Sequence, residues 1–218
     1  MKTSVTQLKR INSAKLSYLS VLFLSVFTVT EQATAQTQVY DNFEGSKSLF
    51  YGAKSGVLDT VAKNPSPDKV NSSAKCALYV RNASKKFDNI KMVPSAKLAD
   101  VSPFATYLGV PPQLKMKIYT TAPAGTLVEI LLGSKGRNNE YPEGTNSQFQ
   151  AYTTVSGKWE ELSFKFSQIP EGSQTGTTHV DQVTLLFNPN SSNSDTYYFD
   201  EITGPALLSG SDATIKEK

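Results

Sequence analysis

Residues 146–166 read NSQFQAYTTVSGKWEELSFKF, and this stretch decides the fold that the sequence predicts. Apolar and polar residues alternate on both sides of a turn signal at residues 156–158. A period of two with one apolar face is typical of antiparallel strands that cover a core. We therefore predict a hairpin whose second run, Leu162, Phe164 and Phe166, faces the core.

The same alternation recurs in short runs along the chain, separated by Gly, Pro, Ser and Asn. Strands are expected at residues 39–44, 56–61, 75–82, 87–93, 113–120, 127–132, 181–188 and 196–202. The rest of residues 46–67 is expected to be loop, and residues 96–107 a turn or a short helix. With no long helical period, this spacing predicts an all-β, antiparallel β-sandwich of a single domain.

The amino-terminal residues have the pattern of a secretory signal peptide. Basic residues precede an apolar run at residues 16–29, and Ala33-Thr34-Ala35 is a small-residue cleavage site. The apolar run is short and rich in serine for a membrane span. We expect a signal peptide at residues 1–35, a β-sandwich domain at 36–204 and a flexible tail at 205–218. The mature protein would be secreted, either extracellular or periplasmic, without a membrane anchor.

Removing the signal peptide changes the charge of the chain. It contains four of the 22 Lys and Arg residues and one of the 19 Asp and Glu residues, which leaves 18 of each sign. The excess of basic over acidic residues therefore comes from the signal peptide, and nucleic acid is not an expected partner of the mature chain. Cys76 is the only cysteine, so no intrachain disulfide can form. It shares the apolar parity of Leu78 and Val80, which predicts a buried, inert thiol.

Three short motifs carry a resemblance to a known family. They are Asp41-Asn42-Phe43-Glu44, the hairpin with Trp159, Leu162, Phe164 and Phe166, and the closing run Tyr197-Tyr198-Phe199-Asp200-Glu201-Ile202. In this order they resemble galactose-binding-like jelly-roll domains, in particular the carbohydrate-binding modules of secreted polysaccharide-degrading systems. The resemblance extends over residues 39–204. It implies a jelly-roll β-sandwich that binds a polysaccharide or glycan, with a companion glycan-degrading enzyme as a possible partner.

The resemblance also implies a structural calcium ion. In such domains, acidic residues after the first strand and at the end of the last strand share the ion. The corresponding residues here are Asp41, Glu44 and Asp200. Carboxylates brought together from the two ends of a domain repel each other, and a hard cation with oxygen ligands removes that repulsion.

The polar parity of the central strands offers a candidate glycan site. If these strands share one sheet, their outward side chains form one face with aromatic rings for stacking and polar groups for sugar hydroxyls. The candidate ligand-binding residues are Tyr79, Arg81, Lys117, Tyr119, Glu129, Gln148, Gln150 and Tyr152. The alternative is an ordinary solvated sheet face.

Two further features leave alternatives open. The loop at residues 133–145, with Arg137, Asn138, Asn139 and Tyr141, is either a second site on the rim or a solvated loop. By strict alternation, the side chain of Trp159 points to the other face of the strand from that of Leu162. It is therefore either an exposed stacking platform or, after a β-bulge, part of the core, and we favour packing in the core or at its rim.

We predict a non-catalytic binding protein, not an enzyme. Glu160 and Glu161 are adjacent on a strand and point to opposite faces, so they cannot act as a catalytic pair. Two other classes remain: an extracellular structural or adhesion domain that binds protein, and a small glycoside hydrolase or polysaccharide lyase. The first predicts an exposed apolar patch, and the second predicts two carboxylates in one cleft.

Overall fold

A computed structural model describes residues 35–136 and 140–208 of the chain. The predicted signal peptide, except for Ala35, and residues 209–218 of the predicted tail lie outside the described residues. Eleven strands occur in the described part. They are β1 (Thr37–Asp41), β2 (Leu49–Lys54), β3 (Val57–Lys63), β4 (Lys75–Val80), β5 (Ile90–Pro94), β6 (Leu114–Thr120), β7 (Leu127–Gly133), β8 (Thr145–Tyr152), β9 (Trp159–Gln168), β10 (Gln182–Phe187) and β11 (Thr196–Pro205).

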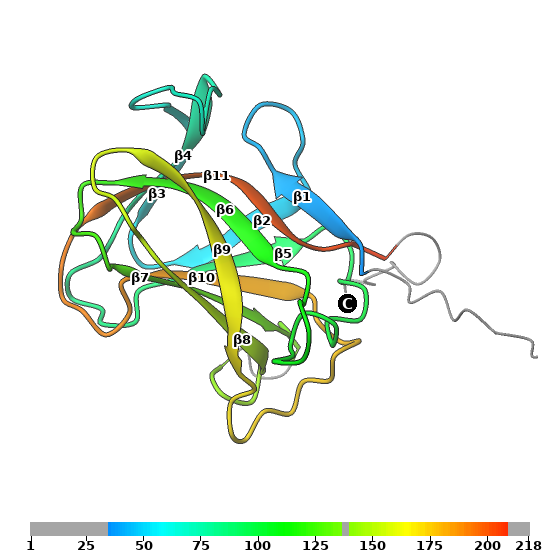
Figure 1. Ribbon diagram of the computed structural model, residues 1–218. Helices are drawn as coiled ribbons and strands as arrows, with labels where there is room; N and C mark the ends of the chain where they lie inside the picture. The colour runs from blue at the N-terminus through cyan, green and yellow to red at the C-terminus, as the bar shows by residue number, and fades with distance from the viewer. Residues whose placement is uncertain (1–34, 137–139, 209–218) are drawn as a thin grey trace, which may run out of the picture. The chain divides into compact units, whose positions relative to one another are not determined.

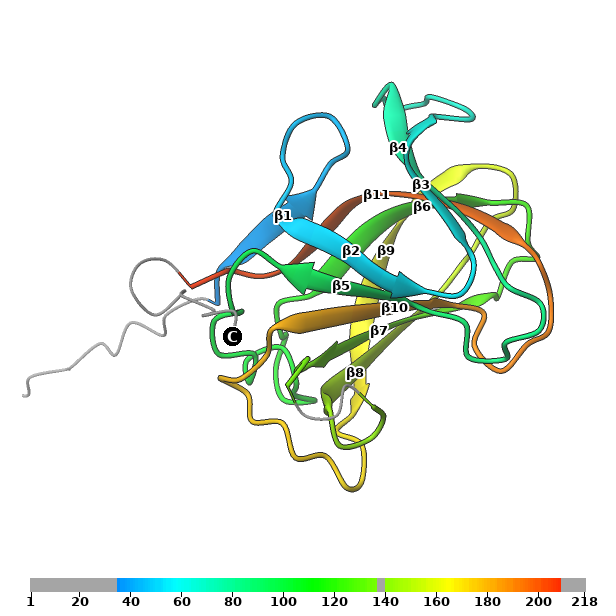
Figure 2. The same ribbon diagram turned by 180° about the vertical axis from the view of Figure 1, so that it is seen from behind.

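The strands form two antiparallel layers that face each other across the core (Figure 1). Sheet A has the order β3-β4-β11-β6-β9, and β1 pairs with the far end of β11. Sheet B has the order β2-β5-β10-β7-β8-β9, and Figure 2 shows β2, β5, β10 and β7 side by side in it. The prediction of an all-β antiparallel sandwich is confirmed.

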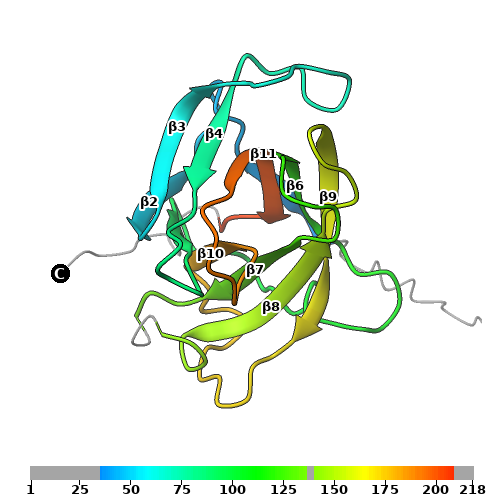
Figure 3. The same cartoon turned by 90° about the vertical axis from the view of Figure 1, so that its left-hand side faces the viewer.

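Strand β9 belongs to both sheets and joins them at one side of the sandwich. Its first half pairs with β6, from Trp159 opposite Tyr119 to Phe164 opposite Leu114. Its second half pairs with β8, where Gln150 lies opposite Lys165. Figure 3 shows β9 beside β8 at one end only. Strands that change sheets in this way form the corners of sandwiches.

The predicted hairpin is therefore right in its strands and wrong in its pairing near the turn. A tight hairpin at residues 156–158 would pair β8 and β9 most closely beside that turn. The two strands instead pair only at their far ends, because the Trp159 end of β9 forms its ladder with β6. Gly157 still makes the turn, with φ of 70°, and its amide donates to Thr120 O over 2.7 Å.

The inward parity predicted for β6, β7 and β10 is confirmed by burial. Met116, Ile130 and Leu185 are representative, since each is at most 1% exposed. The two sheets meet in an aromatic stack, where Phe187 of β10 and Tyr197 of β11 lie nearly parallel with centroids 4.5 Å apart. Stacked pairs of this kind contribute about 0.5–1.5 kcal/mol beyond the area they bury.

The parity predicted for β4 is wrong. Ala77 and Tyr79 are buried in the core, whereas Leu78 and Val80 are half-buried on the opposite face. Tyr79 packs against Phe187 with centroids 6.0 Å apart, and its hydroxyl donates to Asp88 Oδ1 over 2.7 Å. A tyrosine whose hydroxyl has a hydrogen-bond partner can occupy a core position. The core face of β4 is therefore formed by the alternate set of residues to the one predicted.

Three local predictions have mixed outcomes. Residues 49–54 form β2, although they were expected to be loop. Residues 96–107 contain turns and no helix. The thiol of Cys76 is buried as expected, and burial, with the nearby carboxylates of Asp200 and Asp59, raises its pKa to about 12.

The carboxyl-terminal boundary lies beyond residue 204. β11 ends at Pro205, and Leu207 forms a bridge with Leu98. Across residues 35–136 and 140–208, no helix is long and apolar enough to cross a membrane.

Candidate ligand-binding groove

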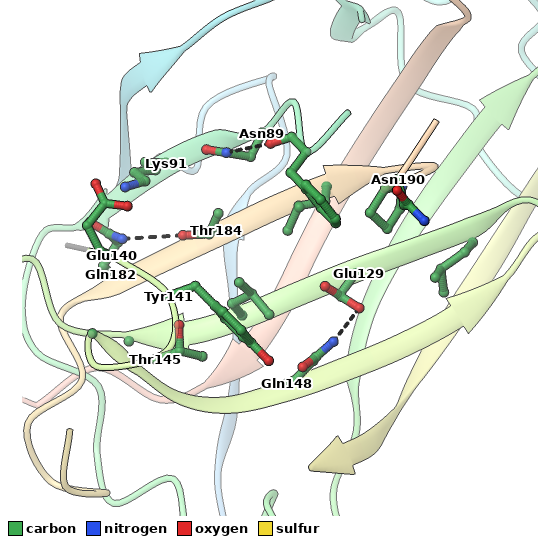
Figure 4. Close-up of a pocket in the computed structure, with 17 residues that line it drawn as sticks. Asn89, Lys91, Glu129, Glu140, Tyr141, Thr145, Gln148, Gln182, Thr184 and Asn190 are labelled. Carbon is green, nitrogen blue, oxygen red and sulfur yellow. Dashed lines mark hydrogen bonds between the residues drawn. The ribbon is translucent and has the colours of Figure 1, made fainter. Parts of the chain in front are cut away.

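A groove of about 640 Å³ crosses the face of sheet B that points away from the core. Its floor comes from alternate residues of β7 and β10, whose other residues face the core. Residues before β5 and after β10 form one wall, and the β7–β8 loop forms the other (Figure 4). Polar side chains in the lining are Asn89, Lys91, Glu129, Glu140, Tyr141, Thr145, Gln148, Gln182, Thr184 and Asn190.

Glu129 is the centre of a hydrogen-bond network in the groove floor. Its Oε2 accepts hydrogen bonds from Gln148 Nε2 over 2.6 Å and from Gln150 Nε2 over 2.8 Å. The register of the β7–β8 ladder places Gln150 directly opposite Glu129. Because two amides hold one oxygen, the carboxylate is fixed as an acceptor at one place in the groove.

The network continues from Gln148 to the rim. Gln168 Nε2, at the end of β9, donates to Gln148 Oε1 over 3.0 Å and to the hydroxyl of Tyr141 over 3.5 Å. Each amide therefore has a defined direction, with its NH₂ group pointing to the next acceptor. The network connects the groove floor to the Tyr141 ring, which Figure 4 shows above the β8 strand.

Two exposed aromatic rings come from opposite walls of the groove. Tyr141 in the β7–β8 loop is 56% exposed, and Phe87 in the β4–β5 loop is 62% exposed. Large apolar side chains exposed at the edge of a polar groove are the surfaces on which the apolar face of a sugar can stack.

The structure divides the eight predicted ligand-binding residues between two sheets. Glu129, Gln148 and Gln150 lie together on sheet B. Tyr79, Arg81, Lys117 and Tyr119 lie on or beside strands of sheet A, away from the groove. The condition that all these strands share one face is thus not met.

The four residues of sheet A have other contacts. Tyr79 and Arg81 are buried. Lys117 Nζ pairs with Glu201 Oε1 over 2.6 Å. Tyr119 lies on the outer face of sheet A, where its ring is 5.8 Å from Tyr198 and 5.9 Å from Trp159.

Tyr152, the eighth predicted residue, is 56% exposed but lies outside the groove. It lines a second hollow of about 710 Å³, where β8 and β9 diverge. Along β8 the groove lining ends at Gln148, whereas Gln150, like Tyr152, lines the second hollow.

Several groove residues were not predicted. Gln182 and Thr184 of β10 have the polar parity opposite Val183 and Leu185, so the alternation rule applied to that strand would have identified them. Phe87, Asn89 and Asn190 come from loops, and no periodic signal marks them. Tyr141, from the predicted rim loop, does line the groove, while Arg137, Asn138 and Asn139 lie outside the described residues.

Trp159 is buried, but on the outer face of sheet A and not in the core cluster, and it has no β-bulge. It is 3% exposed and keeps regular pairing with Tyr119. Its Nε1 donates to Asn64 Oδ1 over 2.9 Å. The loop between β3 and β4 therefore covers the ring on the outer face of sheet A, and Trp159 is not a stacking platform.

The three residues predicted to bind calcium lie in different environments. Asp41 and Asp200 are buried, and burial raises the pKa of each carboxyl. Asp41 accepts from Phe43 N and the Tyr51 hydroxyl. Asp200 accepts from Glu201 N and Asn71 Nδ2.

Glu44 is exposed and accepts from the amides of Ala74 and Lys75. Glu44 and Asp200 thus both contact the segment at residues 71–75, where Asn71 and Ser73 supply further oxygen atoms. These residue types suit a hard cation. In the described part of the chain, however, no three acidic, His or Cys side chains form a group that could hold a metal.

The acidic residues of the groove do not form a close pair. Glu129 is in the floor and Glu140 is at the rim, and Figure 4 shows them well apart. Glu160 accepts from Thr154 and Glu161 pairs with Lys115 over 2.8 Å, and neither lines the groove. Two carboxylates that flank one glycosidic bond would have to face each other.

No protein-family model matches this sequence, and no curated protein matches it either. Among solved structures, it is similar to the family 11 carbohydrate-binding module of the cellulosomal cellulase Lic26A-Cel5E of Clostridium thermocellum. The identity is 15% and the TM-score 0.47, over 80% of this chain and 98% of the module.

A family 30 carbohydrate-binding module is 13% identical with a TM-score of 0.41, over 74% of this chain and 90% of the module. An exo-β-agarase is 11% identical with a TM-score of 0.46, over 78% of this chain and 25% of the agarase. The predicted resemblance to carbohydrate-binding modules is confirmed as a structural similarity. At these identities it concerns the β-sandwich fold alone.

Proposed function

We propose that the groove on sheet B binds a polysaccharide or glycan without cleaving it. The observation that carries the proposal is the network centred on Glu129, in which a fixed acceptor and oriented amides lie between two exposed aromatic rings. Sugars present apolar faces and hydroxyl edges, and both have matching surfaces here.

The polar groups favour an uncharged glycan. Glu129 accepts hydrogen bonds from hydroxyl groups, and Gln148, Gln182 and Thr184 supply amides and a further hydroxyl. The charged side chains of the lining are Glu129, Glu140 and Lys91, and their excess of negative charge opposes the approach of a polyanionic chain.

We further propose that the protein acts outside the cell and beside a glycan-degrading enzyme. The signal-peptide pattern in the sequence supports export. The separation of the groove carboxylates supports a non-catalytic role. We also propose calcium as a structural ion held by Asp200 and its neighbours, since the burial of two carboxylates on the paired strands β1 and β11 is costly without a cation.

A glycan panel tests the proposed function. Residues 36–218 would be screened against soluble and insoluble polysaccharides, with the release of reducing ends measured in parallel. We expect micromolar or weaker binding to at least one neutral glycan and no release of sugar. Binding to no glycan would exclude the proposal, and release of sugar would instead support the hydrolase or lyase alternative.

A further inference from the structure

Arg81 is a buried guanidinium group that joins two loops. It follows β4 directly and is 2% exposed. One loop, residues 82–89, connects β4 to β5, and the other, residues 188–195, connects β10 to β11. Both loops contribute residues to the same wall of the groove.

The two ends of the guanidinium contact both loops. Nη1 donates to Ser191 Oγ over 2.8 Å, to Asn193 Oδ1 over 2.6 Å and to Asn193 O over 3.1 Å. Nη2 donates to Ser191 O and to Lys86 O, each over 3.2 Å, and to Lys85 O over 3.3 Å. Five donors in a planar fork allow one arginine to bind carbonyl groups from separate segments.

The loops that Arg81 joins carry one wall of the groove. Phe87 and Asn89 come from the first loop, and Pro189 and Asn190 come from the second. A direct contact between the loops is a hydrogen bond from Asn190 N to Lys86 O over 2.8 Å. The guanidinium adds six hydrogen bonds, to carbonyl and side-chain oxygens of both loops, to this direct contact.

We propose that Arg81 is a positioning residue for ligand binding: it holds the two loops together so that Phe87 and Asn190 face the groove. This role rests on the proposed function of the groove. It replaces the prediction that Arg81 contacts the ligand itself, which its burial excludes.

Lysine cannot replace arginine in this role. A lysine ammonium is a single point with three donors, so it cannot take the positions of Nη1, which contacts Ser191 and Asn193, and of Nη2, which contacts both loops, at the same time. Arg81→Lys keeps the positive charge and most of the aliphatic stem, so it removes chiefly the contacts of one end of the fork.

The first test measures the wall without any ligand. Amide hydrogen exchange of the full chain would be compared between the wild type and Arg81→Lys. We expect faster exchange confined to residues 85–89 and 188–193, because these backbone groups lose their clamp. Unchanged exchange in these loops would overturn the proposal. If Arg81→Lys does not fold, Asn193→Ala removes one acceptor without altering the buried charge and should act in the same direction.

The second test measures binding to two probes, a β-1,3-1,4-linked tetrasaccharide and xylohexaose. We expect Arg81→Lys to weaken binding about fivefold to tenfold at temperatures well below its melting transition. Met116→Ala, a core change on sheet A, is the control that lowers the melting temperature and keeps the wild-type dissociation constant.

A double-mutant cycle separates positioning from general stability. If Arg81 acts through the wall, Arg81→Lys has little further effect on binding in a Phe87→Ala background. Equal losses in both backgrounds would overturn the proposal. If the wild type binds neither probe, the proposed function fails for these glycans, and the exchange measurement alone decides on the role of Arg81.

Discussion

Glu129 and Gln148 lie on neighbouring strands of sheet B, and the side-chain amide of Gln148 donates to the carboxylate of Glu129 over 2.6 Å. Gln150 donates to the same oxygen over 2.8 Å. The ladder between β7 and β8 thus fixes the direction of both amides and of the carboxylate. This arrangement makes the groove floor rigid before a ligand arrives, which lowers the entropy cost of binding.

Glu129→Gln should weaken glycan binding about tenfold. The substitution keeps the size of the side chain but replaces the charged acceptor, and hydrogen bonds to charged groups contribute about 1.5–3 kcal/mol each. Isothermal titration with the best glycan of the panel measures the change. Glu161→Gln, on the outer face of sheet A, is the matched control and should bind as the wild type does. Equal affinities for all three proteins would place the binding site elsewhere.

Tyr141 and Tyr152 form a matched pair for testing aromatic stacking. Both are 56% exposed, but only Tyr141 lines the groove. Tyr141→Ala should weaken binding about threefold to tenfold through the loss of stacking. Tyr152→Ala should have no effect. The reverse result would assign binding to the hollow between β8 and β9.

Trp159 should respond to folding and not to ligand. It is the only tryptophan of the chain and is buried with a hydrogen bond to Asn64. Its fluorescence should be typical of a buried indole and unchanged by glycan. Trp159→Phe should cost about 1–3 kcal/mol of unfolding free energy and leave affinity unchanged. Quenching of its fluorescence by a bound glycan would contradict this assignment.

Much of the fold could be predicted because its strands alternate. In β6 the apolar parity alone identifies the core face. In β7 and β10 the polar residues Glu129, Gln182 and Thr184 mark the outer face, although leucines also lie there. β4 shows where parity fails, since Leu78 and Tyr79 are both suitable for burial. Only the tertiary partners of the Tyr79 hydroxyl, Asp88 and Gly56, decide between them.

The candidate site could be predicted only in part, because parity does not show which strands share a sheet. Glu129, Gln148 and Gln150 were brought together as expected. Lys117 and Tyr119 have the same polar parity but lie on the other sheet, since β9 changes sheets between Phe164 and Lys165. That change depends on long-range pairing, and no local pattern encodes it.

The buried carboxyls of Asp41 and Asp200 should make the folding stability of the metal-free protein fall as pH rises. Burial raises the pKa of both carboxyls above 3.8 in the folded state. The folded protein then binds more protons than the unfolded chain, so stability falls as pH rises from about 3.8 through the raised pKa values. Chemical denaturation with a chelator present should show this decline. Asp200→Asn should make the fall of stability with pH less steep. An unchanged steepness would show that Asp200 does not contribute to this fall.

Calcium should reverse this decline, because a bound cation favours the ionised carboxylates. At neutral pH we expect a chelator to lower the melting temperature of the wild type, and added calcium to restore it. Saturation at 100 times the dissociation constant corresponds to about 2.7 kcal/mol. At a pH below the raised pKa values, protonation competes with calcium, so the chelator should have a smaller effect.

Asp200→Asn is the test of the site and should abolish the response to calcium at neutral pH. Glu161→Gln should retain it, since Glu161 lies on the outer face of sheet A in a pair with Lys115. An identical melting temperature with and without chelator, together with no calcium in elemental analysis of the purified protein, would exclude the ion.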